Sequence, residues 1–386
     1  MKFTSLTHRF MVWFAAVSLL PILMTGYSLL RTFETEMQKT AIQQVSAIAD
    51  MKAEQIDSYL RERLLDTRVI QTASTTREAM REFTQVFTQS GVGSDAYRQL
   101  DASYRDHFKR FVKDAGYYDL FLISPQGTVV YSQPHESDFA TNLLTGPYRN
   151  SGLGAVTRQA LNMLQSGVSD FEHYAPSDGA IAAFMAFPIV VQGKIEGVLA
   201  LQIYSERVFQ VLTDNVGLGA SGETVVTRLE DKNTALVMAP LKDEPDAALK
   251  FKIPLNTPPL STAIWSSLHG QRGAGLTMDY RGKEVVAAWR YLPRMSWGME
   301  VKMDADEVFA PVYRVRALGL LILSLTLLAA ILGAILFSRR MVTTLKTLSR
   351  SAQDIAAGNL QQRVPVEGWD EIGQLARTFN TMTERL

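Results

Sequence analysis

Two uncharged apolar runs divide this chain of 386 residues into three parts. The runs cover residues 10–30 and 317–337, and each could form a helix of about 30 Å, the thickness of a bilayer's hydrocarbon core. The first run is longer than the roughly 7–15 apolar residues of a cleaved signal peptide. We therefore predict two transmembrane helices, with residues 1–9 and 338–386 as the terminal segments.

Cations beside the two runs predict their orientation. The flanking cations are Lys2 and Arg9 before the first run, Arg339, Arg340, Lys346 and Arg350 after the second, and Arg314 and Arg316 before the second. Because cytoplasmic flanks carry the excess of Lys and Arg, we expect both termini in the cytoplasm. Residues 31–316 would then lie in the periplasm, and the chain would be a multi-pass protein of the inner membrane.

Apolar positions in the outer part change from a helical to a strand-like period near residue 116. The first stripe recurs about every 3.7 residues and predicts a helix to about residue 75, packed on its own domain, on a second copy, or on both. The stripe is Ile42, Val45, Ala49, Ala53, Ile56, Leu60 and Leu64. A second helical pattern covers 97–111.

Short alternating runs beyond residue 116 predict two sheets in succession. The first, antiparallel sheet comprises 117–124, 128–132, 171–174, 182–191 and 195–204, with helices near 156–164 and 205–212. The second comprises 222–229, 234–241, 274–280, 284–292 and 297–303, with a helix in 259–270. A last helix, 304–316, leads into the second apolar run.

Composition narrows the possible functions. The 39 Lys and Arg balance 39 Asp and Glu, which argues against a nucleic-acid partner. The absence of cysteine excludes disulfides, thiolate metal sites and cysteine nucleophiles. No Ser/His/Asp or paired-carboxylate arrangement stands out, so we expect neither catalytic residues nor a cofactor in these residues.

The C-terminal segment contains two short amphipathic stretches, 341–356 and 372–386, joined by a connector. Two such helices cannot bury their apolar seams alone, which favours a parallel dimeric four-helix bundle. The motifs AAGNL (356–360), RVPV (363–366) and DEIG (370–373) resemble a HAMP linker. Thr344 stands where that family commonly has proline.

The HAMP resemblance implies which residues relay the signal. They are Leu345, Val364, Val366, Asp370, Glu371 and Gly373. Glu371 would tie the second helix to the base of the first, and Val364 and Val366 would pack on the bundle. The chain ends within a heptad, so we expect it to be the amino-terminal part of a longer receptor.

The segments 116–132, 169–204 and 285–312 resemble a double Cache sensor domain over residues 31–316. The resemblance implies an α+β fold with a long N-terminal helix and two tandem PAS-like antiparallel-sheet modules. The distal module would cover about 116–204 and the proximal module about 218–303. It also implies a bacterial sensor of small extracellular molecules, with its pocket in the distal module.

Candidate ligand-binding residues of the distal module are mostly aromatic or charged. They are Tyr118, Tyr131, Asp138, Tyr148, Arg149, Asp170, Tyr174 and Ser177. An aromatic box with a carboxylate suits a cation or an amine, whereas adding Arg149 would suit an amino acid or an organic acid. Double Cache receptors for amino acids carry Arg-x-Trp-Tyr and Tyr-x-Asp clusters. Here Tyr148 is kept but His173 and Ala175 replace the later Tyr and Asp, so a typical α-amino acid is not expected.

A divalent metal such as zinc is an alternative ligand. His135, Glu136 and Asp138 lie in one loop, and Asp170, Glu172 and His173 lie in another segment. Strand alternation would point members of 170–173 to different faces, so we expect no metal site.

The expected partners are a small-molecule ligand, the membrane, a second copy of the chain and a downstream cytoplasmic module. We expect that module to be a sensor histidine kinase. A methyl-accepting chemoreceptor or a diguanylate cyclase remains the alternative, because residues 1–386 contain no phosphoacceptor-histidine box, nucleotide-binding loop, GGDEF-like signature or methylated coiled coil.

Overall fold

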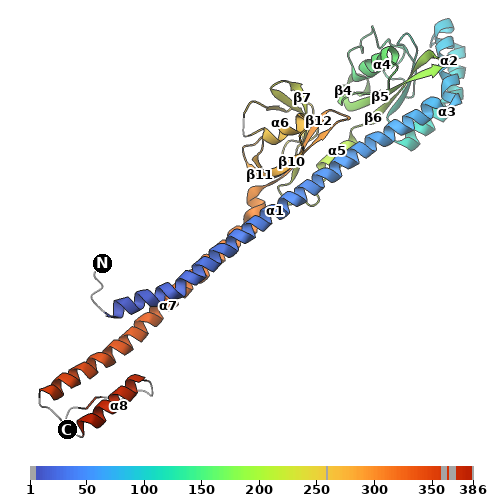
Figure 1. Ribbon diagram of the computed structural model, residues 1–386. Coiled ribbons are helices and arrows are strands. Elements are labelled where there is room, and N and C mark those ends of the chain that lie inside the picture. The colour runs from blue at the N-terminus through green and yellow to red at the C-terminus, as the bar shows by residue number, and fades with distance from the viewer. Residues whose placement is uncertain (1–5, 258–259, 358–362, 365–370, 385–386) are drawn as a thin grey trace. The chain divides into compact units, whose positions relative to one another are not determined.

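The computed structural model describes residues 6–257, 260–357, 363–364 and 371–384 (Figure 1). The chain forms two compact units. One is Gln38–Val308, and the other combines Met1–Met37 with Phe309–Leu386. Each unit is described by itself below.

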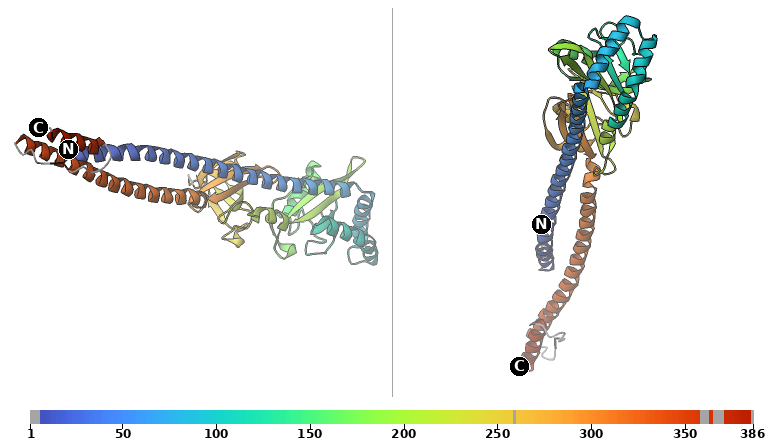
Figure 2. Two further views of the ribbon diagram at one scale, coloured as in Figure 1. Left: turned by 90° about the horizontal axis from the view of Figure 1, so that it is seen from below. Right: turned by 90° about the vertical axis from the view of Figure 1, so that its right-hand side faces the viewer.

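Three helices open the chain: α1 (Leu6–Thr72), α2 (Ser74–Ser90) and α3 (Asp95–Ala115). Val45, Ala49, Ile56 and Leu60 of the predicted α1 stripe are buried. The helix ends near the expected residue 75, where Ala73 adopts an extended backbone. Helix α2 was not predicted, although it buries Ala79, Met80 and Phe83. Both sheets described below lie along α1 (Figures 1 and 2).

The distal module contains a six-stranded antiparallel sheet in the order β2-β1-β6-β5-β3, with β4 also paired to β5. Its elements are β1 (Asp119–Ile123), β2 (Val129–Ser132), α4 (Gly152–Met163), β3 (Gly167–Val168), β4 (Glu172–Tyr174), η1 (Ala175–Ser177), β5 (Ala180–Val191) and β6 (Lys194–Tyr204). Helix α4 packs Leu153, Val156 and Ala160 on one face of this sheet. Aromatic residues of α2 and α3 pack on the other face.

The proximal module repeats this arrangement, with a sheet in the order β10-β11-β12-β7-β8-β9. Its elements are β7 (Glu223–Asp231), β8 (Thr234–Val237), η2 (Pro245–Ala247), β9 (Lys252–Pro254), α6 (Thr262–Leu268), β10 (Gly273–Met278), β11 (Glu284–Leu292) and β12 (Trp297–Asp304), and α5 (Glu206–Thr213) precedes it. Strand β8 ends at Val237 and is therefore shorter than the predicted 234–241.

Helix α7 (Ala305–Ala356) follows β12 directly, and α8 (Glu371–Thr383) lies beyond the predicted connector. Within the described residues, one stretch is long and apolar enough to cross a membrane, Ala305–Gly333 of α7, and its apolar window is not buried. It includes most of the second predicted span. The first predicted span, 10–30, lies in α1, where several side chains are outside the description.

Only part of the predicted HAMP relay falls on described residues. Val364 is buried, and its backbone N–H and C=O bond the Asn380 side chain of α8, both at 2.9 Å. Gly373 is buried in α8. Val366, Asp370 and the side chains of Leu345 and Glu371 lie outside the described residues.

Candidate functional site

The candidate site is built on a pair of buried polar residues on the α4 face of the distal sheet. Asp119 opens β1 and lies opposite Gln202 of β6. One carboxylate oxygen of Asp119 accepts hydrogen bonds from the amides of Leu120 and Gln133, at 2.5 and 2.8 Å. Within the described residues, Asp119 Oδ2 and Gln202 Oε1 are buried without a hydrogen-bond partner.

The loop between β2 and α4 adds two further carboxylates. The Tyr174 hydroxyl donates to Asp138 Oδ2 at 2.6 Å. Ser177 donates to Glu136 Oε2 at 2.7 Å and accepts from Gln202 Nε2 at 3.1 Å, and Tyr118 also donates to Glu136. The second oxygen of Asp138 is buried and lacks a partner in the described part of the chain. We call Asp119, Glu136, Asp138, Tyr174, Ser177 and Gln202 the distal cluster.

Within the described part of the chain, no Lys or Arg forms an ion pair with Asp119, Glu136 or Asp138, and the pKa values of two of these acids are raised. Burial raises the pKa of Asp119 well above its usual range, and the nearby Asp138 and Glu136 raise it further. Burial also raises the pKa of Asp138, against the Tyr174 hydrogen bond, which lowers it. A positive charge placed among these groups would relieve both effects.

Five of the eight candidate ligand-binding residues lie in or beside the distal cluster. Tyr118, Asp138, Tyr174 and Ser177 take part in its hydrogen bonds. Tyr148 lies at its edge, where its hydroxyl is 2.8 Å from Ser137 Oγ and its ring centroid is 6.3 Å from that of Tyr174.

The other three candidates do not join the cluster. Tyr131 is on the opposite face of the sheet, because it pairs with Leu122 and its ring packs 4.9 Å from Phe83 of α2. Arg149 is exposed on the loop before α4. Asp170 lies where the distal module meets the proximal module.

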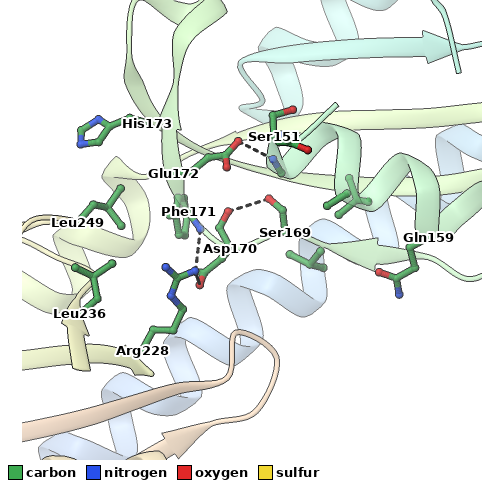
Figure 3. Close-up of a pocket in the computed structure, with 15 residues that line it drawn as sticks. Ser151, Gln159, Ser169, Asp170, Phe171, Glu172, His173, Arg228, Leu236 and Leu249 are labelled. Atoms are coloured by element: carbon green, nitrogen blue, oxygen red, sulfur yellow. Dashed lines mark hydrogen bonds and ion pairs between the residues drawn. The ribbon is translucent and has the colours of Figure 1, made fainter. Parts of the chain in front are cut away.

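A groove of about 500 Å³ lies around Asp170 (Figure 3). Asp170 Oδ2 pairs with Arg228 Nη1 of β7 at 2.8 Å, and Asp170 Oδ1 accepts the indole N–H of Trp297 of β12 at 2.9 Å. On the distal side, Glu172 accepts the amide of Gly152 at the start of α4, at 2.7 Å. Asp170 therefore links the two modules, and its contacts leave it little capacity for a ligand.

The residues considered for a metal site have other partners. His135 stacks on Phe139 with ring centroids 4.0 Å apart, and His173 Nδ1 lies 2.9 Å from the carbonyl of Gly179. Across the described ranges, no group of three or more His, Asp or Glu residues is placed to hold a metal ion.

Sequence reasoning missed Asp119 and Gln202 and considered Glu136 only as a metal ligand. The available signal was a charged residue at the start of an otherwise apolar strand, DLFLI, which buries all its positions. A buried carboxylate at such a position requires a specific partner or a function.

Comparisons with known proteins identify two domains. The Cache domain family matches residues 33–312, and the HAMP domain family matches residues 336–386. Methyl-accepting chemotaxis protein McpA of Pseudomonas putida is 26% identical over 223 residues, which cover 55% of this chain and 32% of that protein. Sensor histidine kinase MtrB of Mycobacterium tuberculosis is 46% identical over 62 residues, 16% of this chain and 11% of that protein.

Among solved structures, the sensor domain of the V. cholerae histidine kinase DctB aligns with a TM-score of 0.45 and 13% identity. The alignment covers 69% of this chain and 98% of that domain. The chain spans about a third of the length of the chemotaxis proteins that it matches. It belongs to the Cache domain family, and a HAMP domain follows its Cache domain.

Proposed function

We propose that this chain is the input part of a homodimeric inner-membrane receptor that binds a small organic cation in its distal module. Its Cache and HAMP domains make it a signal-transduction receptor. We place the distal module at about 116–204 and the proximal module at about 218–303. We also propose that both 10–30 and 317–337 are transmembrane helices and that both termini are cytoplasmic.

One observation carries the ligand class: the unused hydrogen-bonding atoms of the distal cluster are all oxygens, and they accept hydrogen bonds when Asp119 and Asp138 are ionised, the form that a bound cation favours. They are Asp119 Oδ2, Asp138 Oδ1 and Gln202 Oε1. A ligand that satisfies them must donate hydrogen bonds, and the carboxylates around them favour a positive charge. Within the described residues, no Lys or Arg forms an ion pair with the carboxylates of the distal cluster.

These features favour a primary amine or a diamine over an amino acid or an organic acid. A ligand carboxylate would need a donor such as a guanidinium, and Arg149, the one candidate, is exposed rather than directed into the cluster. The rings of Tyr174 and Tyr148 lie beside the acceptors and add a cation–π surface.

A continuous set of contacts leads from the distal cluster toward the membrane helix. Tyr174 ends β4, and Asp170 precedes that strand. Asp170 bonds Trp297, which opens β12, and β12 continues directly into α7. A ligand that moves β4 would thus act on the strand that leads to α7 and the HAMP domain.

For the output, we propose a sensor histidine kinase, since sensor histidine kinase MtrB of Mycobacterium tuberculosis is 46% identical over 62 residues. The longer match, 26% identity over 223 residues, is to a methyl-accepting chemotaxis protein, which favours a chemoreceptor as the second candidate. A diguanylate cyclase is a further alternative. Incubating the native receptor with labelled ATP separates the candidates, because only a kinase transfers the phosphoryl group to itself.

The ligand class is tested by thermal unfolding of the 386-residue chain in lipid nanodiscs. Monoamines and diamines are compared with organic acids and α-amino acids. A ligand at one hundred times its dissociation constant should stabilise the chain by about 2.7 kcal/mol, a rise of a few degrees in Tm. A rise with acids and none with amines would contradict the proposed class.

Two variants locate the site. Asp138→Asn removes a charge from the distal cluster and should weaken amine binding at least tenfold by isothermal titration calorimetry. Arg149→Ala, a change at an exposed neighbour, should leave the amine affinity unchanged. Equal affinities for Asp138→Asn and the unmodified chain would place the binding site elsewhere.

A further inference from the structure

The two modules place a buried polar pair at the same position of their sheets. In the distal module, Asp119 opens β1 and faces Gln202 of β6. In the proximal module, Glu223 opens β7 and faces Lys302 of β12. The strand orders around the two pairs are equivalent, β2-β1-β6-β5 and β8-β7-β12-β11.

Both pairs also lie on the sheet face that carries the module's own helix. Asp119 is two residues before Phe121, which packs with α4, and Glu223 is two residues before Val225, which packs with α6. Because side chains alternate along a strand, each acid shares the face of its apolar neighbour. The two pairs are therefore structural counterparts.

Lys302 occupies its position as a bound cation would. Its ammonium lies 3.0 Å from Glu223 Oε2 and 2.6 Å from Asp279 Oδ2, and 4.1 Å above the centroid of the Tyr280 ring. The side chains of Lys302 and Asp279 are fully buried, and that of Glu223 is 3% exposed. Two carboxylates and an aromatic face form a complete ammonium site.

We propose that Glu223, Asp279 and Tyr280 form an ammonium-binding site in the proximal module, and that Lys302 is its permanent occupant. The distal counterpart has carboxylates with unused acceptor atoms and no cation of the chain among the described residues. The proximal module is thus held in a cation-bound state by its own side chain, whatever the receptor binds elsewhere.

The occupied site fixes the start of the helix that leads to the membrane. Asp279 Oδ2 also accepts from Arg281 Nε at 2.7 Å, and Arg281 Nη2 reaches Asp304 Oδ1 at 2.7 Å. Asp304 ends β12, and in the first turn of α7 Glu307 accepts the amide of Ser221 at 2.7 Å. The beginning of α7 is therefore bound to the proximal sheet through the residues that surround Lys302.

Removal and replacement of the cation test this proposal. Lys302→Ala empties the site, whereas Lys302→Met fills the space with an apolar chain of similar length. Thermal unfolding of each full chain in nanodiscs is followed with rising ethylammonium or propylammonium chloride. Sodium chloride at equal ionic strength corrects for screening, and the unmodified chain measures any amine response of the distal module.

We expect Lys302→Ala to lower the Tm by several degrees and an alkylammonium ion to restore at least half of the loss, saturably. Lys302→Met should respond no more than the unmodified chain. The proposal would be wrong if an alkylammonium ion raised the Tm of Lys302→Ala no more than sodium chloride does. It would also be wrong if Lys302→Met showed the same rise in Tm.

Loss of Lys302 leaves the buried Glu223 without an ion-pair partner among the described residues, while Asp279 keeps Arg281, so a second variant guards against failure to fold. Lys302→Ala combined with Glu300→Gln removes a further buried acid of β12 and is measured in the same way. If neither variant folds even when produced with propylammonium present, the site does not accept a free ammonium ion and the proposal is wrong.

Discussion

Replacing Glu300 by Gln should remove a large part of the pH dependence of stability. Glu300 lies on β12 next to the ammonium site, is 1% exposed, and has no hydrogen-bond partner within the described residues for either carboxylate oxygen. Burial raises its pKa from 4.5 to about 7; Lys302 lowers it, and Asp279 and Glu223 raise it. Arg281, on the turn beyond Asp279, also lowers it.

The size and sign of this pH dependence follow from the pKa values of Glu300 in the folded and unfolded chain. The folded chain holds the Glu300 proton up to about pH 7, whereas the unfolded chain releases it near pH 4.5. The stabilisation from this group is therefore complete below pH 4.5 and is lost as the pH rises to about 7. At about 1.4 kcal/mol for each tenfold difference in proton affinity, the loss amounts to about 3 kcal/mol.

Urea unfolding of the 386-residue chain in nanodiscs, followed by tryptophan fluorescence, measures this loss. Glu300→Gln should be close to the unmodified chain in free energy of unfolding at pH 5 and more stable by about 3 kcal/mol at pH 8. The comparison cancels contributions from other acids with raised pKa values, such as Asp119. Parallel pH profiles of the two chains would refute the reasoning.

Two further changes probe contacts within the unit Gln38–Val308. Lys52→Met removes a buried ammonium of α1 that donates to the carbonyls of 211, 212 and 214 and to Thr224 Oγ1. We expect urea unfolding to show that the free energy of unfolding falls by about 3 kcal/mol, and a fall of less than about 1 kcal/mol would contradict this. Trp297→Phe should lower the free energy of unfolding by about 1–2 kcal/mol in the same assay. A double-mutant cycle with Asp170→Asn should show coupling between the two residues. Additive losses would mean that the hydrogen bond from the indole to the carboxylate does not contribute to stability.

Much of the fold could be predicted because each strand carries its own pattern. The run 284–292 coincides with β11, and the predicted hairpin at 117–132 is formed by β1 and β2. Helix α2 was not predicted because it packs on the distal sheet with few apolar residues: Ala79, Met80 and Phe83 are its buried ones. Tertiary contact, more than local pattern, identifies such an element.

The candidate site was harder to predict because it depends on which face of the sheet each residue occupies. Tyr131 and Asp119 lie on adjacent strands, yet only Asp119 faces α4, because a shift of one residue reverses the face. Asp170 is among the residues that the sequence predicts for the pocket. Its partners, Arg228 and Trp297, come from the proximal module and cannot be read from local sequence.

The asymmetry between the modules determines where a ligand can act. A ligand shifts a conformational equilibrium only by the difference in its affinity for the two states. In the proximal module Lys302 already provides the cation, so an external amine finds the proposed ammonium site occupied. The distal cluster, with its unused oxygens, is the site that we propose for a ligand whose binding energy depends on conformation. In the proposed receptor the signal would then pass through contacts between the modules, and Asp170 with Arg228 and Trp297 supplies polar contacts through which β4 could act on β12 and hence on α7.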